Sequence, residues 1–165
     1  PPRSTLFPYT TLFRSSRSKK VELLARVFDH ATNRFIKGFR LLTLGWSDGN
    51  SFLGIDFALL SSTDDKHRYT EVDARIDKRC CGFRRRKEAM SKTTDLLEPM
   101  VERAVRLGVR ARYLLMDSWF SMPVVISTLR KHIHIICMIK DQPTWLYEYN
   151  GKRLRLSDLY AKAIS

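Results

Sequence analysis

The sequence has few acidic residues, and this shortage narrows the class of partner. Its 17 Asp and Glu are outnumbered by 30 Lys and Arg, which gives a net charge of +13 and a pI near 10.1. Such an excess of cations favours a polyanionic partner, bound through phosphate contacts and counterion release. A basic surface that is merely solvated is the alternative. No long basic amphipathic helix is evident that would favour a membrane surface.

Cysteines and long apolar runs are scarce too. The three cysteines, Cys80, Cys81 and Cys137, do not suggest a disulfide framework. Cys80 and Cys81 are adjacent, a spacing that suits neither a mutual bridge nor a usual zinc pair. No apolar run reaches the roughly 20 residues that a membrane span needs, and the N-terminal residues lack the continuous apolar core of a secretory signal. We therefore expect a protein of the reducing cytoplasm with no membrane partner.

The opening segment differs in origin from the rest of the chain. Residues 5–15, TLFPYTTLFRS, match the in-frame translation of the end of a common short-read sequencing adaptor. We therefore predict that residues 1–15 are adaptor-derived and non-native, joined to a gene fragment, and we set them aside for the fold as one would a fusion scar. A native apolar and aromatic N-terminal arm is the alternative.

Strand and turn patterns dominate from residue 34 onward. Residues 39–46 and 51–60 are apolar-rich, and residues 47–50 between them (Ser-Asp-Gly-Asn) tolerate the positive φ of a tight turn. This pattern predicts a β-hairpin. Residues 21–29 favour a short helix or turn that leads into a strand, and residues 63–68 favour a loop.

Helical periodicity and short strands come after the hairpin. Residues 87–107 predict one amphipathic helix that ends before Gly108, because apolar side chains recur every three or four residues, at Leu97, Met100, Val101, Ala104 and Val105. Residues 112–116 and 133–139 predict strands, and a helix opened by Pro123 separates them. Strand, helix and strand at this spacing predict a parallel βαβ unit.

The order of these elements predicts the fold class. A hairpin, a helix and a βαβ unit give a mixed α/β sheet in which antiparallel strands precede parallel ones. A ribonuclease-H-like sheet with flanking helices has this order, provided that one further strand precedes residue 16. Residues 147–156, centred on Asn150-Gly151, predict another hairpin.

Asp117 is the first candidate for a chemical role. It ends an apolar strand, and open α/β sheets bind ligands at the carboxyl ends of their strands. An aspartate in this place also caps helices, so its position alone leaves a cap and a catalytic ligand equally open.

A resemblance to a known family begins at this motif. Residues 113–121, YLLMDSWFS, resemble the second-aspartate motif of the IS4-type DDE transposases. The later segments HIICMIKDQP and YEYNGKRLRLSDLY resemble the catalytic domain of that family, as do the earlier SRSKKVELLARVFDH and KGFRLLTLGWSDGNSFLGIDFALLSS. The resemblance covers residues 16–165. It implies a ribonuclease-H-like domain whose three acids bind two Mg²⁺ or Mn²⁺ ions and which cleaves and transfers DNA strands at the ends of insertion sequences.

The resemblance makes Asp117 a catalytic acid and a metal ligand, but it is incomplete. In similar transposases the first acid lies in an Asp-Asp-Ser/Thr strand, which here falls within residues 1–15. The catalytic glutamate lies beyond a β-rich insertion subdomain, which residues 142–165 begin. Residues 16–141 are then a partial core with one of three acids, which predicts an inactive fragment. The complete enzyme would act as a homo-oligomer on double-stranded DNA, at transposon ends and targets, in the bacterial nucleoid.

Basic residues are the candidates for DNA contact. They are Arg84, Arg85, Arg86, Lys87 and Lys140. A solvated face is the alternative for the run 84–87. The competing function for the whole chain is a non-catalytic basic module that binds nucleic acid through charge alone.

Other conspicuous residues favour structural roles. Trp119 and Phe120 are interpreted as core anchors rather than base-stacking groups. Asp29 lacks the Asp-Asp-Ser/Thr context of a first catalytic acid. We expect Asp48 in a turn and Asp56 within the sheet. His132 and His134 share a strand face, but no third metal ligand accompanies them.

Overall fold

A computed structural model describes residues 4–15 and 17–164 of the chain. Its strands are β1 (Thr5–Arg14), β2 (Ala25–Asp29), β3 (Arg34–Ser47), β4 (Phe52–Leu60), β5 (Tyr113–Met116), β6 (His134–Cys137), β7 (Tyr147–Tyr149) and β8 (Lys152–Leu154). Its helices are α1 (Cys81–Ala89), α2 (Thr93–Arg106), α3 (Pro123–Leu129) and α4 (Leu156–Ile164), with a short 3₁₀ turn η1 (Asp65–His67).

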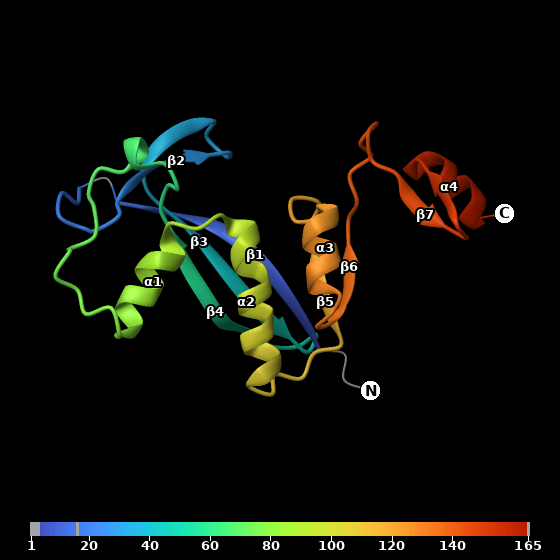
Figure 1. Ribbon diagram of the computed structural model, residues 1–165, viewed down its shortest axis with the longest axis horizontal. Helices are drawn as coiled ribbons and strands as arrows, with labels where there is room; N and C mark the ends of the chain where they lie inside the picture. The colour runs from blue at the N-terminus through green and yellow to red at the C-terminus, as the bar shows by residue number, and fades with distance from the viewer. Residues whose placement is uncertain (1–3, 16, 165) are drawn as a thin grey trace.

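Six strands form one mixed sheet. The long strand β3 pairs antiparallel with β1, β2 and β4, and β1 then pairs parallel with β5, which pairs parallel with β6. The sheet is therefore antiparallel in its first half and parallel in its second (Figure 1). The predicted fold class, a mixed α/β sheet of the ribonuclease-H-like kind, is confirmed.

The strand required before residue 16 is formed by β1. All ten of its residues pair with β3, from Thr5 opposite Ser47 to Arg14 opposite Gly38. Its sequence is rich in aromatic and β-branched residues that suit a pleated sheet, and Leu6 is fully buried. Pro8 is unusual in a central strand because it cannot donate a backbone hydrogen bond. The segment that the sequence analysis excluded from the fold therefore contains a central strand of the sheet. The adaptor origin of residues 1–15 stays a prediction.

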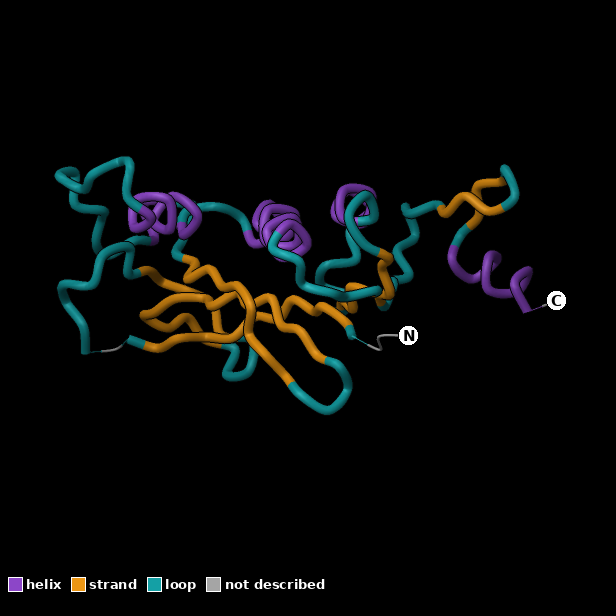
Figure 2. Tube along the Cα trace, turned by 90° about the horizontal axis from the view of Figure 1, so that it is seen from below, coloured by secondary structure: helices purple, strands orange, loops and turns teal. Residues whose placement is uncertain are grey.

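Helices α1, α2 and α3 lie together on one face of the sheet (Figure 2). The core between the two layers joins Leu42 and Leu114 of the sheet to Leu97, Met100 and Val101 of α2. The predicted apolar stripe of α2 is thereby confirmed, apart from Val105, which is 43% exposed. Gly108 follows the helix with φ +81°, a left-handed conformation that favours glycine.

The prediction of one helix over residues 87–107 is wrong, because the chain forms α1 and α2 with a break between them. The carbonyl of Ala89 accepts the N–H of Ser61 at the end of β4, at 2.8 Å, so it is engaged outside the helix. Lys92 then adopts an extended conformation before Thr93 starts α2. The break coincides with this contact to the end of a distant strand, which helical periodicity does not reveal.

Aromatic side chains gather on the face of the sheet opposite to helices α1, α2 and α3. Phe52 lies 5.3 Å from Phe7 and 6.0 Å from Tyr9 between ring centroids, and it is 52% exposed. Within the residues that the structure describes, no helix covers this opposite face of the sheet (Figure 2).

Two predicted units follow α2: one completes the main sheet, and the other is a small two-stranded sheet. The predicted βαβ arrangement β5–α3–β6 is confirmed, and so is the hairpin β7–β8, whose turn residues Asn150 and Gly151 have φ +48° and +72°. Sequence reasoning missed α4, which follows β8 and lies with the hairpin away from the main sheet (Figure 1). No helix in the described part of the chain has both the length and the apolar character to cross a membrane.

Candidate active site and nucleic-acid interface

Asp117 follows the last residue of β5 and is exposed to solvent. Its Oδ1 accepts the backbone N–H of Trp119 at 2.7 Å, and its carbonyl accepts the N–H of Phe120 at 3.2 Å. The carboxylate therefore stabilises the turn between β5 and α3, but it does not cap α3, whose N-cap residue is Met122. Its Oδ2 makes no hydrogen bond within the described residues, so the same side chain can also receive a ligand.

The turn around Asp117 is held firmly by its neighbours. Phe120 is 2% exposed and packs in the core, and the hydroxyl of buried Ser121 donates to the carbonyl of Ser118 at 2.9 Å. Pro123 then opens α3 at its first turn, where a missing N–H costs nothing. A carboxylate anchored between a strand and a helix in this way has a defined position at the edge of the sheet.

The residues around Asp117 do not fit a two-metal centre. Strands β1 and β5 pair in parallel with Thr5 beside Tyr113 and Leu6 beside Leu114. The pairing ends there, but the same offset aligns position 9 of β1 with position 117, and Tyr9 offers a phenol in place of a carboxylate. Across residues 4–15 and 17–164 no group of three His, Cys, Asp or Glu side chains could hold a metal ion. Hard divalent cations require several oxygen ligands, which one exposed carboxylate does not supply.

Asp29 is buried and fully engaged in local structure. Its Oδ2 accepts from the Arg14 guanidinium at 2.6 Å and from the Thr32 hydroxyl at 2.9 Å, while its Oδ1 accepts the Ala31 N–H at 3.0 Å. The Arg14 hydrogen bond, helped by that of Thr32, lowers the pKa of Asp29 to about 2. These contacts stabilise the turn between β2 and β3, in agreement with the absence of a catalytic motif around this residue.

Within the run 84–87, two of the four cations are occupied by carboxylates. Arg85 pairs with Glu88 at 3.0 Å and with Asp56 at 3.4 Å, and Arg86 pairs with Glu22. The side chains of Arg84 and Lys87 are exposed, and neither forms an ion pair with any described residue. Of this candidate DNA contact, Arg85 and Arg86 are therefore engaged in ion pairs within the protein, whereas Arg84 and Lys87 are exposed and available to a ligand.

Lys140 lies beside the turn that carries Asp117. Its ammonium is 5.4 Å from the centroid of the Trp119 ring. Both residues line a hollow of about 380 Å³, together with Arg40, Lys92, Thr93, Thr94, Ser118, Met122, Gln142 and Trp145. The hollow brings three cations, Arg40, Lys92 and Lys140, together beside Ser118 and Trp119, the two residues that follow Asp117.

The interpretation of Trp119 as a core anchor is wrong, although that of Phe120 is correct. Trp119 is 51% exposed, whereas Phe120 is 2% exposed. These adjacent side chains lie in the turn after β5, where Asp117 accepts the backbone N–H groups of both residues. No sequence signal separates the two aromatics, since which one is buried depends on the path of the turn.

His132 and Cys80 have structural partners. His132 lies 3.2 Å from Glu98 of α2, and the sulfur of Cys80 accepts the Phe83 N–H at 3.3 Å at the start of α1. Asp48 accepts two N–H groups of the β3–β4 turn, and Asp56 lies within the sheet. The structural roles expected for the two aspartates are confirmed.

The sequence of the chain matches one family of known proteins. The family described as DDE superfamily endonuclease matches residues 10–141, a span that includes Asp117, the run 84–87 and Lys140. Searches of curated proteins and of solved structures gave no match.

Proposed function

The chain belongs to the DDE superfamily of endonucleases, and we therefore propose that it carries part of the catalytic domain of an IS4-type transposase. Such an enzyme cleaves and transfers DNA strands at the ends of an insertion sequence. The observation that supports this most directly is Asp117, an exposed carboxylate at the carboxyl end of a parallel strand within the matched span. Ligands of open α/β sheets bind at this edge.

We assign to Asp117 one metal-ligand position of the complete transposase. Two Mg²⁺ or Mn²⁺ ions would there supply the activation of a water or a DNA 3′-hydroxyl and the neutralisation of phosphate charge. The described residues provide one of the three acids, so this chain is proposed to bind DNA without cleaving it. In the complete enzyme we propose a homo-oligomer on double-stranded DNA, in the cytoplasm and associated with the nucleoid.

The described residues themselves supply phosphate contacts. Lys140 lies at the turn of Asp117, and Arg84 and Lys87 extend from α1 without carboxylate partners among the described residues. Arg85 and Arg86 retain their charge but are held by acidic neighbours, so we propose that they contribute less to DNA binding. The net charge of +13 supplies the long-range attraction.

Long-read sequencing of the source locus through both ends tests the transposase proposal. An Asp-Asp-Ser/Thr strand upstream, a glutamate-bearing helix downstream and flanking inverted repeats would support it. A native reading through residues 5–15 together with a frame that lacks both acids would favour the competing function, a basic module that binds nucleic acid by charge alone.

A biochemical test uses the full-length enzyme recovered from that locus. Asp117→Ala should abolish its metal-dependent cleavage and leave charge-driven DNA binding nearly intact, because one exposed carboxylate adds nothing to phosphate attraction. Equal loss of cleavage and binding would contradict the role given to Asp117.

A further inference from the structure

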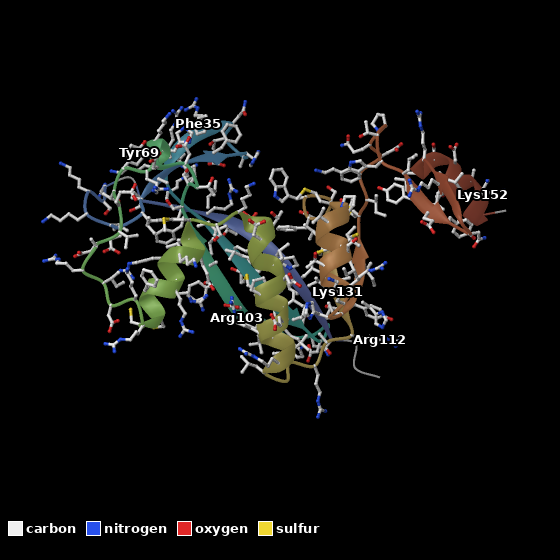
Figure 3. All side chains as sticks on the ribbon, in the orientation of Figure 1. Phe35, Tyr69, Arg103, Arg112, Lys131 and Lys152 are labelled. Atoms are coloured by element: carbon white, nitrogen blue, oxygen red, sulfur yellow. The ribbon has the colours of Figure 1, made fainter. Side chains whose placement is uncertain are left out.

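The exposed ring of Trp119 is the end of a row of aromatic side chains. Its centroid lies 5.7 Å from that of His30, which lies 4.9 Å from that of Phe28. Phe28 in turn lies 5.1 Å from Phe35 on the neighbouring strand. The row, Phe35–Phe28–His30–Trp119, thus connects the β2–β3 hairpin to the turn after β5, and Figure 3 labels Phe35 at the hairpin end. We refer to these four residues as the aromatic row.

A cation stands at each end of the aromatic row. The guanidinium carbon of Arg26 lies 4.1 Å from the centroid of Phe35, and the ammonium of Lys140 lies 5.4 Å from that of Trp119. Both distances are within the range of a cation–π interaction. The row is therefore a surface on which flat rings lie between positive charges.

The aromatic row is a surface feature and takes no part in the hydrophobic core. Phe35 is 55% exposed and Trp119 is 51% exposed, and neither belongs to the buried clusters. Large exposed rings in a contiguous series are uncommon on a protein surface without a binding role. Their energetic contribution to folding is correspondingly small, which leaves the rings free to serve a partner.

Two hollows run alongside the row and share cationic walls. The hollow beside Trp119 measures about 380 Å³, and a second of about 310 Å³ lies beside Phe28 and Phe35. Arg40 and Lys92 line both of them, so the two hollows adjoin. With Arg26 in one and Lys140 in the other, four cations border this path.

We propose that the aromatic row and its cations bind an unpaired DNA strand, with bases stacked on the rings and phosphates held by the four cations. The inference rests on the proposed function, because DNA is there the substrate. Bases of a duplex are stacked on one another and cannot use exposed rings, whereas an unpaired strand offers ring faces and phosphates together. The four cations along this path favour a polyanion as the ligand. The aromatic row favours a polyanion whose bases are accessible for stacking. The row ends two residues from Asp117, so such a strand would lie next to the proposed cleavage site.

The test compares affinity for single-stranded and duplex DNA. A fluorescein-labelled strand of about 12 nucleotides and the matching duplex are titrated with the 165-residue chain, and anisotropy gives each dissociation constant. Trp119→Ala should weaken single-strand binding about tenfold or more, since stacking on one aromatic ring typically supplies that much. Duplex affinity should change less than about twofold, and Trp119→Phe should restore most of the single-strand affinity.

Phe57→Ala provides the matched control. Phe57 is 55% exposed and has its own cation, Arg85 at 5.3 Å, but it lies on β4 outside the aromatic row. Its removal should leave both affinities unchanged. Circular dichroism melts of each variant verify that the fold is retained.

The outcomes separate this inference from the proposed function. Binding of neither DNA form would contradict the proposed function itself. Binding of both forms with no effect of Trp119→Ala, or with equal weakening of both, would overturn the stacking role and leave the proposed function standing. Self-association that Trp119→Ala abolishes, with DNA affinity unchanged, would assign the row to a contact between copies of the chain and likewise overturn the inference.

Discussion

The guanidinium of Arg103 on α2 donates to the carboxylate of Asp56 on β4 at 2.9 Å, across the interface between the helix layer and the sheet (Figure 3). Arg103 also reaches Glu88 of α1 at 3.2 Å, and Arg85 contacts the same two carboxylates. Four charged side chains thereby join β4, α1 and α2. The Asp56 side chain is only 11% exposed, whereas Arg103 is 31% and Arg85 46% exposed, so the carboxylate is shielded from water and its cations are partly solvated.

Removing Asp56 should destabilise the fold. Asp56→Ala leaves two partly exposed arginines without their shared carboxylate, and loss of charge-assisted hydrogen bonds at such a site costs about 1–3 kcal/mol. Urea unfolding followed by circular dichroism measures the change. Arg75→Ala, which breaks the exposed pair with Asp73, is the control and should cost under about 1 kcal/mol. Equal effects of both variants would show that the Asp56 network does not stabilise the layer interface.

Asp29 should make stability depend on pH in the acid range. Its pKa is lowered from 3.8 to about 2 by the Arg14 and Thr32 hydrogen bonds. The unfolded chain therefore binds a proton before the folded chain does, so the contribution of Asp29 is complete above about pH 4 and is lost as the pH falls toward 2. The melting temperature, measured from pH 6 to pH 2, should fall less steeply in Asp29→Asn than in the unaltered chain. Asp65→Asn, at an exposed turn, should show the same fall of melting temperature with pH as the unaltered chain. If the fall were equal in Asp29→Asn, Asp65→Asn and the unaltered chain, Asp29 would not be the source of the pH dependence.

A second carboxylate, introduced at position 9, should create a metal site with Asp117. The β1–β5 pairing ends at Leu6 and Leu114, and the same offset aligns position 9 with Asp117, so Tyr9→Asp would place a second acid at the corresponding position of the neighbouring strand. Oxygen ligands are those that Mn²⁺ and Mg²⁺ prefer, and Mn²⁺ binding can be followed by electron paramagnetic resonance. We expect binding by Tyr9→Asp that is lost when Asp117→Ala is added.

The control for this substitution is Thr11→Asp, two residues further along the same strand. Its new carboxylate is an exposed charge away from Asp117, so it should not bind Mn²⁺ measurably. Equal binding by the two variants would show that position 9 has no special relation to Asp117.

Arg84 and Arg85 should differ in their effect on DNA binding. Arg84 is exposed without a carboxylate partner among the described residues, whereas Arg85 is held by Asp56 and Glu88. Arg84→Ala should weaken duplex binding and reduce the slope of log affinity against log salt by about one, the value for one phosphate contact. Titrations at NaCl concentrations from about 50 to about 200 mM provide the slope. Arg85→Ala should alter the urea midpoint more than the slope, and the reverse pattern would contradict the division of the run.

Elements whose causes are local could be predicted from the sequence. The Ser47–Asn50 turn, the Asn150-Gly151 hairpin and the Pro123 helix start each depend on the backbone preferences of two to four adjacent residues. The apolar stripe of α2 depends on a repeat within fourteen residues. These were predicted correctly, and with them the order of strands that defines the fold class.

Features that depend on distant partners emerged only on folding. The carbonyl of Ala89 bonds to Ser61 and divides one apparent helix into two, and the pairing of β1 with β3 makes a central strand of a segment whose sequence matches an adaptor. The meeting of His30 with Trp119 joins residues far apart in the chain into one surface. Periodicities, turns and charge could be read along the chain, because they act between neighbours or need no partner. Which cation is paired and which ring is exposed depended on packing, because hydrogen bonds and burial are completed by residues that the chain brings together only on folding.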